Sequence, residues 1–253
     1  QPQILVVRAA ARGHDAAMGI DPAAFGAQSA EEAAGKYCSM LLRSLGAPID
    51  FCQAVAEAIE DTHVRAVPRS LEARIVRAAD LASIGRSYEE VLGNTKRLHQ
   101  ERELLTGTQI SYVGFVGSSL RFLSGYFEQL IALTPTALDQ AGRSWWHMTG
   151  LANVIRLYRE EMGGKQLCVV LGDLTEQGES EIADGTLLLT TAECRISDTL
   201  VQRCLVFRVP GTAAAFPLFD GSADLVVATG VDDGGIKEAL RILSPNGKLI
   251  RPN

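Results

Sequence analysis

Apolar positions in the first part of the chain recur at helical spacing, and no strand-like alternation occurs before about residue 165. Ser29 and Glu32 form a capping-box pattern, which predicts that a helix begins there. Asp50 is expected to cap a second helix, and Pro68 and Ser70 to start a third. Residues 3–94 therefore predict a helical domain. The side chains expected to face inward on these three helices are Ala33, Tyr37, Met40, Leu41, Leu45, Cys52, Val55, Ala56, Ile59, Leu71, Ile75, Val76 and Leu81.

Residues 95–162 also have a helical pattern, with breaks expected near Gly107 and near Thr134-Pro135. After Gly163 the pattern changes to short apolar runs that alternate with helical segments, which predicts a parallel sheet with helical crossovers. The strands are expected over 167–171, 186–191, 204–209, 225–229 and 248–251, with a helix over 235–243.

Composition narrows the class of protein. The chain of 253 residues is 47% hydrophobic and 21% charged, as in an ordinary globular protein, and its formal net charge is −6. Since it has no run of Lys and Arg, a nucleic-acid partner is not expected. Five scattered cysteines without CxxC spacing favour a reducing cytoplasm. We expect neither a membrane span nor a signal peptide, because no apolar run has the required length or flanks.

Four polar residues lie at the ends of predicted helices. His14-Asp15 follows one apolar helix, His63 follows another, and Asp80 ends a third. Imidazole and carboxylate ligands together suit Mn, Fe, Co, Ni or Zn. A metal of this kind makes a nucleophile from water at neutral pH. Spacing alone also allows these residues to be helix-terminal or surface groups.

Two stretches resemble the HD superfamily of metal-dependent phosphohydrolases. Residues 9–15 look like the doublet after which the family is named, and residues 58–85 are similar to its second half, where a histidine precedes a Pro/Leu/Glu segment and an Ala-Asp end. The resemblance covers roughly residues 4–105. It implies a helical bundle with one or two metal ions that hydrolyses a phosphate ester, often a nucleotide.

The resemblance assigns roles to individual residues. His14, Asp15 and Asp80 would be metal ligands, with Asp15 and Asp80 in the catalytic centre. His63 would bind a second metal ion or a phosphate, and Arg86 would contact phosphate. The family has a further histidine upstream of the doublet, whereas none of the thirteen residues before His14 is histidine. The chain is therefore either shortened or has one ligand fewer. Three protein ligands can still hold a catalytic metal ion with open positions, and the alternative is a site that only supports the fold.

The end of the chain resembles a degenerate class I methyltransferase. Residues 216–228 are similar to the segment entering the fourth strand of that fold, and residues 238–249 to the helix and turn entering the fifth. Pro245-Asn246-Gly247 is expected to be a tight turn. The resemblance assigns Gly172 and Glu193 to the cofactor. Because the next glycine after Gly172 is six positions on, the bare loop needed by adenosylmethionine is lacking and its binding is not expected.

We therefore predict an α plus α/β protein with an HD-like domain over 1–105, a helical connector over 106–162 and an incomplete methyltransferase-like domain over 163–253. The leading hypothesis is a hydrolase of a small phosphorylated molecule, with the C-terminal domain regulatory or dimerising. The alternatives are a non-catalytic interaction or sensory protein and, third, a working methyltransferase. Aromatic residues in 110–160 are expected to pack in a core or to form a homo-oligomer interface. They are Phe115, Phe122, Phe127, Trp145 and Trp146.

Overall fold

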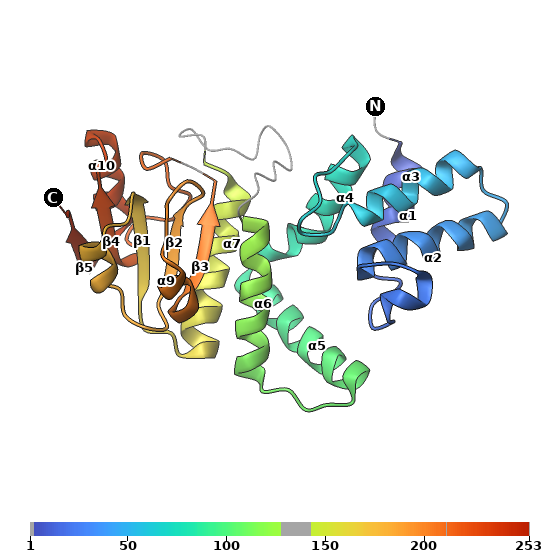
Figure 1. Ribbon diagram of the computed structural model, residues 1–253, viewed down its shortest axis with the longest axis horizontal. Coiled ribbons are helices and arrows are strands. Elements are labelled where there is room, and N and C mark those ends of the chain that lie inside the picture. Colours follow the sequence, from blue (N-terminus) through green and yellow to red (C-terminus); the bar gives the residue numbers. More distant parts are fainter. Residues whose placement is uncertain (1–2, 128–142, 211, 253) are drawn as a thin grey trace. The chain divides into compact units, whose positions relative to one another are not determined.

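The computed structural model describes residues 3–127, 143–210 and 212–252, and the chain divides into two compact units (Figure 1). The N-terminal unit comprises residues 1–83 and 104–107, and the C-terminal unit comprises residues 84–103 and 108–253. The first described strand begins at Leu167, as the sequence pattern predicts.

Four helices form the N-terminal unit. Ser29 caps α2 by accepting a hydrogen bond from the backbone N–H of Glu32 at 3.1 Å, and Ser70 caps α4 in the same way through Ala73. Both caps agree with the sequence pattern. The predicted cap at Asp50 is wrong, because the N-cap of α3 is Pro48 and Asp50 lies inside the first turn, where its charge favours the helix N-terminus. The elements are α1 (Ile4–Gly13), a short 3-10 turn (Pro22–Phe25), α2 (Ala30–Ser44), α3 (Ile49–Glu60), α4 (Leu71–Leu81) and a second 3-10 turn (Ala82–Gly85).

Small side chains form the contact between α2 and α3, which corrects the prediction for the inward face of α2. A Cβ added at Gly35 would lie 3.0 Å from the carbonyl oxygen of Ala56, so the two helices approach closely at this point. Large side chains on that face would hold the helices apart. The buried residues of α2 are therefore Ala33, Ala34, Gly35 and Cys38, whereas Tyr37, Met40, Leu41 and Leu45, as well as Leu71 of α4, are exposed.

The helices of the C-terminal unit precede its sheet. They are α5 (Tyr88–Thr106), α6 (Tyr112–Phe127) and α7 (Trp145–Arg156), which continues as a π-helical turn (Leu157–Glu161). Gly107 separates α5 from α6 with a φ of 64°, while the break predicted at Thr134-Pro135 lies outside the described residues. None of the helices in the described ranges is long and apolar enough to cross a membrane.

Five parallel strands form one sheet in the order β3-β2-β1-β4-β5. Strand pairs joined by helices in this order give a Rossmann-like sheet, as predicted. The strands are β1 (Leu167–Gly172), β2 (Leu187–Thr191), β3 (Leu205–Val209), β4 (Ala223–Thr229) and β5 (Leu243–Ile250), and the helices between them are α8 (Glu176–Ser180), α9 (Asp198–Arg203) and α10 (Asp233–Ile242).

Strand β5 begins five residues before the predicted position. Leu243 pairs with Ala223, and the next regular pair joins Lys248 to Leu225. The Pro245-Asn246-Gly247 sequence therefore forms an irregularity within the strand instead of a turn before it. A bulge of this kind accommodates turn-forming residues while the flanking residues keep their pairing.

Both faces of the sheet are covered. On one face, Phe127 of α6 packs against Phe207 of β3 and stacks on Trp146 of α7, with ring centroids 5.4 and 5.0 Å apart. On the other, Cys168, Val170, Leu188, Leu225 and Val227 form a core with Ile182 and with Leu200 of α9. The prediction of core packing thus holds for Phe127 and Trp146, whereas Phe122 and Trp145 are 56% and 57% exposed.

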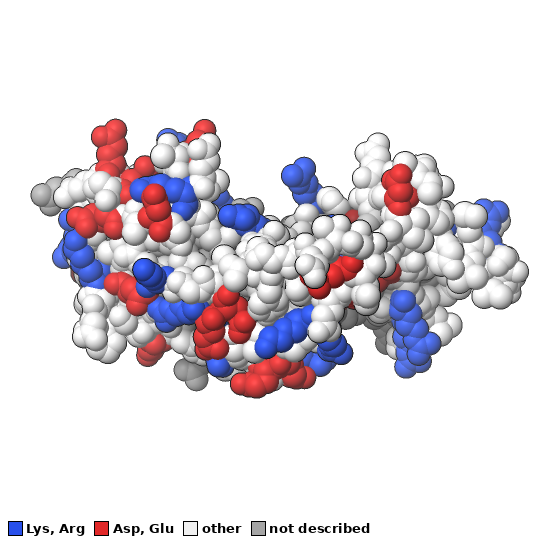
Figure 2. All heavy atoms as spheres, turned by 90° about the horizontal axis from the view of Figure 1, so that it is seen from below, with Lys and Arg blue, Asp and Glu red and all other residues white. Residues whose placement is uncertain are grey.

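Charges of both signs are interspersed on the face seen in Figure 2. In the C-terminal unit several are paired, and Arg241 of α10 has four partners. Its guanidinium binds Glu238 and Asp220 and also donates to the carbonyl oxygens of Phe216 and Leu218. Arg241 therefore fastens the segment that leads into β4 to the helix that follows this strand.

We predict that Gly172→Ala destabilises the C-terminal unit by more than about 3 kcal/mol. Gly172 ends β1 with a φ of 86°, and an added Cβ would lie 2.0 Å from the carbonyl oxygen of Thr229 on the neighbouring strand. The left-handed backbone alone accounts for about 1–2 kcal/mol. Gly185→Ala is the matched control, since Gly185 has a φ of 75° but no atom within 4 Å of the added Cβ. The free energy of unfolding in denaturant should fall further in Gly172→Ala than in Gly185→Ala. Equal decreases in the two variants would contradict the role of the contact with Thr229.

Candidate metal centre

His14, Asp15 and Asp80 meet in the N-terminal unit. Nε2 of His14 lies 3.2 Å from Oδ2 of Asp15 and 3.2 Å from Oδ1 of Asp80. The other ring nitrogen, Nδ1, lies 3.0 Å from the carbonyl oxygen of Ala11. Because a carbonyl only accepts hydrogen bonds, Nδ1 must carry a proton. The structure thus brings together three of the four residues that the sequence pattern singled out.

The packing of α1 explains why these residues meet. Gly13 is buried, and an added Cβ would lie 2.5 Å from Sγ of Cys38 and 3.4 Å from Cδ1 of Ile59. This contact holds the end of α1 against α2 and α3. Asp80 lies in the last turn of α4, which also packs on α1. His14 directly follows Gly13 and so faces the end of α4.

The two carboxylates stabilise a charged imidazole. They raise the pKa of His14 to about 9, chiefly through the hydrogen bond with Asp80, against the opposing effect of partial burial. The side chains of His14, Asp80 and Asp15 are 21%, 32% and 59% exposed, respectively. The cluster is therefore open to solvent on the side of Asp15.

One imidazole and two carboxylates are donor types that divalent transition metals accept. Two ligands that are each about 2.1 Å from a metal, at roughly 90–110° to each other, are about 3.0–3.4 Å apart. Both distances from His14 Nε2, at 3.2 Å, fall in this range, which is also that of an ordinary ion pair. Across the described ranges, however, no group of three or more His, Cys, Asp and Glu side chains is already arranged to hold a metal ion. Binding would require the carboxylates of Asp15 and Asp80 to turn toward a common point.

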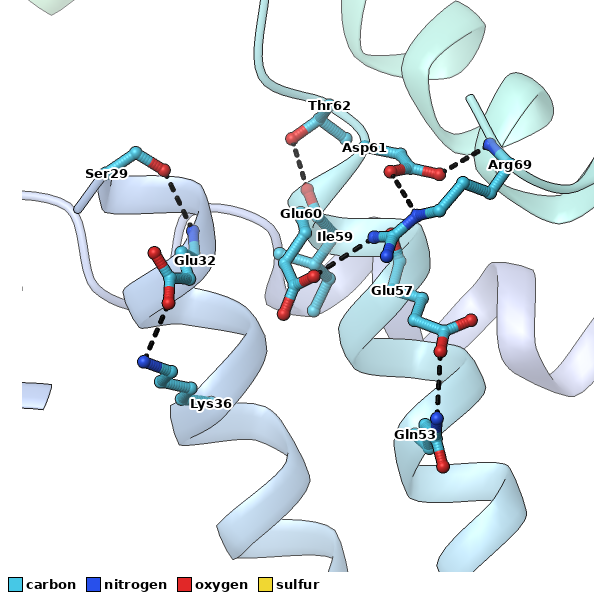
Figure 3. A network of polar contacts seen from close by, with 10 residues as sticks. All are labelled: Ser29, Glu32, Lys36, Gln53, Glu57, Ile59, Glu60, Asp61, Thr62 and Arg69. Atoms are coloured by element: carbon cyan, nitrogen blue, oxygen red, sulfur yellow. Dashed lines mark hydrogen bonds and ion pairs between the residues drawn. The ribbon is translucent and has the colours of Figure 1, made fainter. Parts of the chain in front are cut away.

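His63 lies apart from this cluster, in the loop between α3 and α4. Among the described residues its ring has one hydrogen bond, in which Nδ1 accepts from the backbone N–H of Arg65 at 3.2 Å. Figure 3 shows how the loop is closed at its ends, where Arg69 binds the carboxylates of Asp61 and Glu60. Asp61 is 3% exposed and also accepts the backbone N–H of Arg69 at 2.7 Å.

Arg77 is a structural residue of this region that the sequence analysis missed. It lies on α4 one turn before Asp80 and is 2% exposed. Its guanidinium donates to the carbonyl oxygens of Ala66 at 2.7 Å and Val64 at 2.9 Å. Arg77 thus fastens the loop that carries His63 to the helix that carries Asp80. Its signal in the sequence is a charged residue among the apolar positions Ala73, Val76 and Leu81.

The remaining candidate residues lie in the C-terminal unit. Arg86 is exposed and pairs with Glu90 at 3.4 Å, and Glu193 is exposed after β2. Gly172 cannot carry a side chain without a clash, because the backbone of Thr229 occupies the position that its Cβ would take. Their assignment to phosphate or cofactor binding stays a prediction.

Comparisons of the chain with protein-family models, with curated proteins and with solved structures give no match. No family is therefore identified for this chain.

We predict that Arg77→Met lowers the stability of the N-terminal unit by about 1–3 kcal/mol, because the partly buried carbonyl oxygens of Val64 and Ala66 lose their donor and water replaces it only in part. Arg74→Met is the matched control, since Arg74 is exposed on the same helix. Hydrogen exchange of the core amides of α1 and α3 measures the loss within this unit. If these amides exchange equally slowly in Arg77→Met and Arg74→Met, the structural role of Arg77 is contradicted.

Proposed function

We propose that the N-terminal unit binds a divalent transition metal ion (Mn, Fe, Co, Ni or Zn) at His14, Asp15 and Asp80, and that the protein hydrolyses a small phosphate ester. This is the activity implied by the resemblance to HD-superfamily phosphohydrolases. The observation that carries the proposal is the meeting of His14 and Asp80, distant in the sequence, around one ring nitrogen. Two helices end at the same place with one imidazole and two carboxylates between them.

The orientation of His14 supports the same proposal. Histidines that ligate metals almost always donate their other ring N–H to a carbonyl or carboxylate. His14 does so through Nδ1 to Ala11, which leaves Nε2 directed at the two carboxylates. Asp15 is the most exposed of the three, so its side of the cluster is where water and substrate would enter.

A divalent metal ion, when bound, would supply charge stabilisation for the phosphate and a water-derived nucleophile at neutral pH. The chain's own contribution is to hold the ligands: α1 presents His14 and Asp15, and α4 presents Asp80. We propose a regulatory or dimerising role for the C-terminal unit, whose exposed Phe122 and Trp145 offer apolar surface for self-association.

A second candidate function is a non-catalytic interaction or sensory protein. Two observations favour it. The ligand group is not already arranged around a metal position within the described residues, and the ring of His63 has no bond to the cluster there. In that case the His14 cluster would act as an ion pair that fastens α1 to α4.

The metal content of the purified protein separates these two functions. We expect about one metal ion per chain by elemental analysis, and a weakening of metal affinity by at least about 10–100-fold in His14→Ala. His99→Gln is the control, because His99 lies in the C-terminal unit and bonds to the carbonyl oxygen of Ile110. Metal-free wild-type protein that gains no thermal stability from added Mn²⁺ or Ni²⁺ would leave only the interaction function.

Hydrolysis is tested with a panel of nucleotides and p-nitrophenyl phosphate esters in the presence of Mn²⁺, Co²⁺ or Ni²⁺. We expect metal-stimulated turnover that is lost in Asp80→Ala, because this change removes a ligand carboxylate. Asp184→Asn should keep full activity, since Asp184 is an exposed partner of Arg203 in the C-terminal unit. Turnover of Asp80→Ala at the wild-type rate would exclude this cluster as the active site.

A further inference from the structure

A groove runs between α2 and α3 on the surface of the N-terminal unit. Its volume is about 640 Å³, and it is bordered by Phe25 of the 3-10 turn that precedes α2. The ring of Phe25 lies against that of Tyr37, with the centroids 6.1 Å apart, which holds the turn on α2. His14, Asp15 and Asp80 are not among the residues that line the groove, so it is a feature separate from the candidate metal centre.

Each side of the groove is one stripe of a helix, with side chains at positions i, i+4 and i+7. These residues are Lys36, Met40 and Arg43 on α2 and Ile49, Gln53 and Ala56 on α3. Residues with this spacing share one face of a helix, and seven residues span about 10 Å along its axis. The groove therefore follows two neighbouring helices for two turns, which is the kind of surface into which a third helix packs.

The groove is too open to enclose a small molecule. Met40 and Ile49 are 64% and 66% exposed, so they form its rim. A site for a small ligand buries roughly 70–90% of the ligand surface, which a groove with such an exposed rim does not do. An amphipathic helix needs only one of its faces covered. The shape of the groove and its apolar rim thus favour a helix as the occupant.

The groove is positively charged. Among the described residues that line it, Lys36 and Arg43 are cationic and none is acidic. Lys36 is already paired with Glu32 at 2.7 Å (Figure 3), whereas the guanidinium of Arg43 has no ion pair within the described ranges. Arg43 is therefore available to a carboxylate of the occupant, which a guanidinium can bind through two parallel hydrogen bonds.

A symmetric pair of chains does not supply this carboxylate. A two-fold contact through the groove would place the same surface of two copies opposite itself. The Lys36 and Arg43 side chains of both copies would then lie in one interface, and like charges that face each other disfavour association. The charge of the groove instead fits an occupant with acidic residues.

We propose that the groove between α2 and α3 binds an acidic amphipathic helix of another protein. Apolar side chains of that helix would cover Met40 and Ile49, and a carboxylate on the same face would pair with Arg43. None of the residues that line the groove is a ligand of the candidate metal centre, so this helix binds whether or not a metal ion is bound at His14.

Selection from a displayed peptide library on the full chain tests the chemistry of the occupant. The peptides have about 16 residues, which is long enough to form a helix, and one randomised helical face. We expect enrichment of Leu, Ile or Phe at helical spacing, with Asp or Glu on the same face. If no peptide binds, or if the selected peptides lack acidic residues, the proposal is overturned.

Fluorescence anisotropy with the best selected peptide tests the place of binding. We expect Arg43→Glu and Met40→Glu to weaken binding by about 10-fold or more each, because one reverses the charge and the other puts a carboxylate into an apolar contact. Arg74→Glu and Leu5→Glu are the matched controls, since both residues are exposed on other helices of the same unit. All four side chains are exposed, so circular dichroism should show wild-type folding. If Arg43→Glu binds as tightly as Arg74→Glu, the groove is not the binding site.

A charge exchange tests the pairing with Arg43. The selected peptide with its acidic residues replaced by lysine should bind the wild type weakly and Arg43→Glu about 10-fold more tightly. The absence of such recovery would contradict the pairing. Two other results would assign the groove to a different occupant and overturn the proposal: a wild-type dimer in light scattering that dissociates in Met40→Glu, or binding to phosphatidylglycerol vesicles that is lost in Arg43→Glu.

Discussion

The close packing of Gly13 against Cys38 and Ile59 is the constraint on which the candidate centre depends. A side chain at position 13 would collide with Sγ of Cys38, so either this thiol or α1 would have to move. Movement of α1 would carry His14 away from Asp80. The rest of this core is also built from small side chains, since many of its buried residues are alanine. Helices that touch through small residues approach closely and leave little freedom in their crossing. The positions of their ends, where the polar groups lie, follow from that contact.

Helix α4 connects the two parts of the candidate site. Ser70 caps its first turn, Arg77 fastens the preceding loop, and Asp80 reaches His14. A guanidinium that is 2% exposed would be costly without acceptors, and the carbonyl oxygens of Val64 and Ala66 supply them. These two carbonyl oxygens of the loop in turn receive hydrogen-bond donors from Arg77. A polar residue in the helix face thus determines the conformation of the segment that carries His63.

The sequence was sufficient to predict the helical and parallel-sheet regions, the caps at Ser29 and Ser70 and the meeting of His14 with Asp80. It was insufficient for the buried face of α2, because hydrophobicity ranks Met40 above Gly35 whereas close packing selects the smaller residue. The role of His63 was left open between a metal and a phosphate, because tautomers depend on backbone bonds such as that of Arg65. The full length of β5 was missed because its irregularity resembles a turn in sequence.

The ion-pair and metal interpretations of the His14 cluster use the same atoms, so the distinction depends on features that only one of them requires. An imidazolium between two carboxylates needs no particular partner for its remaining nitrogen, and a water molecule would satisfy it. A metal ligand needs that nitrogen to hold the proton, so that Nε2 is free to bind. The bond from Nδ1 of His14 to Ala11 meets this requirement through the backbone of α1 itself. The opposite bond at His63 shows that this backbone can hold an imidazole in either tautomer. The bond at Nδ1 is therefore common to an imidazolium and to a metal ligand. The proton on Nε2 distinguishes them, because the carboxylates stabilise it and a metal ion can bind His14 only by displacing it.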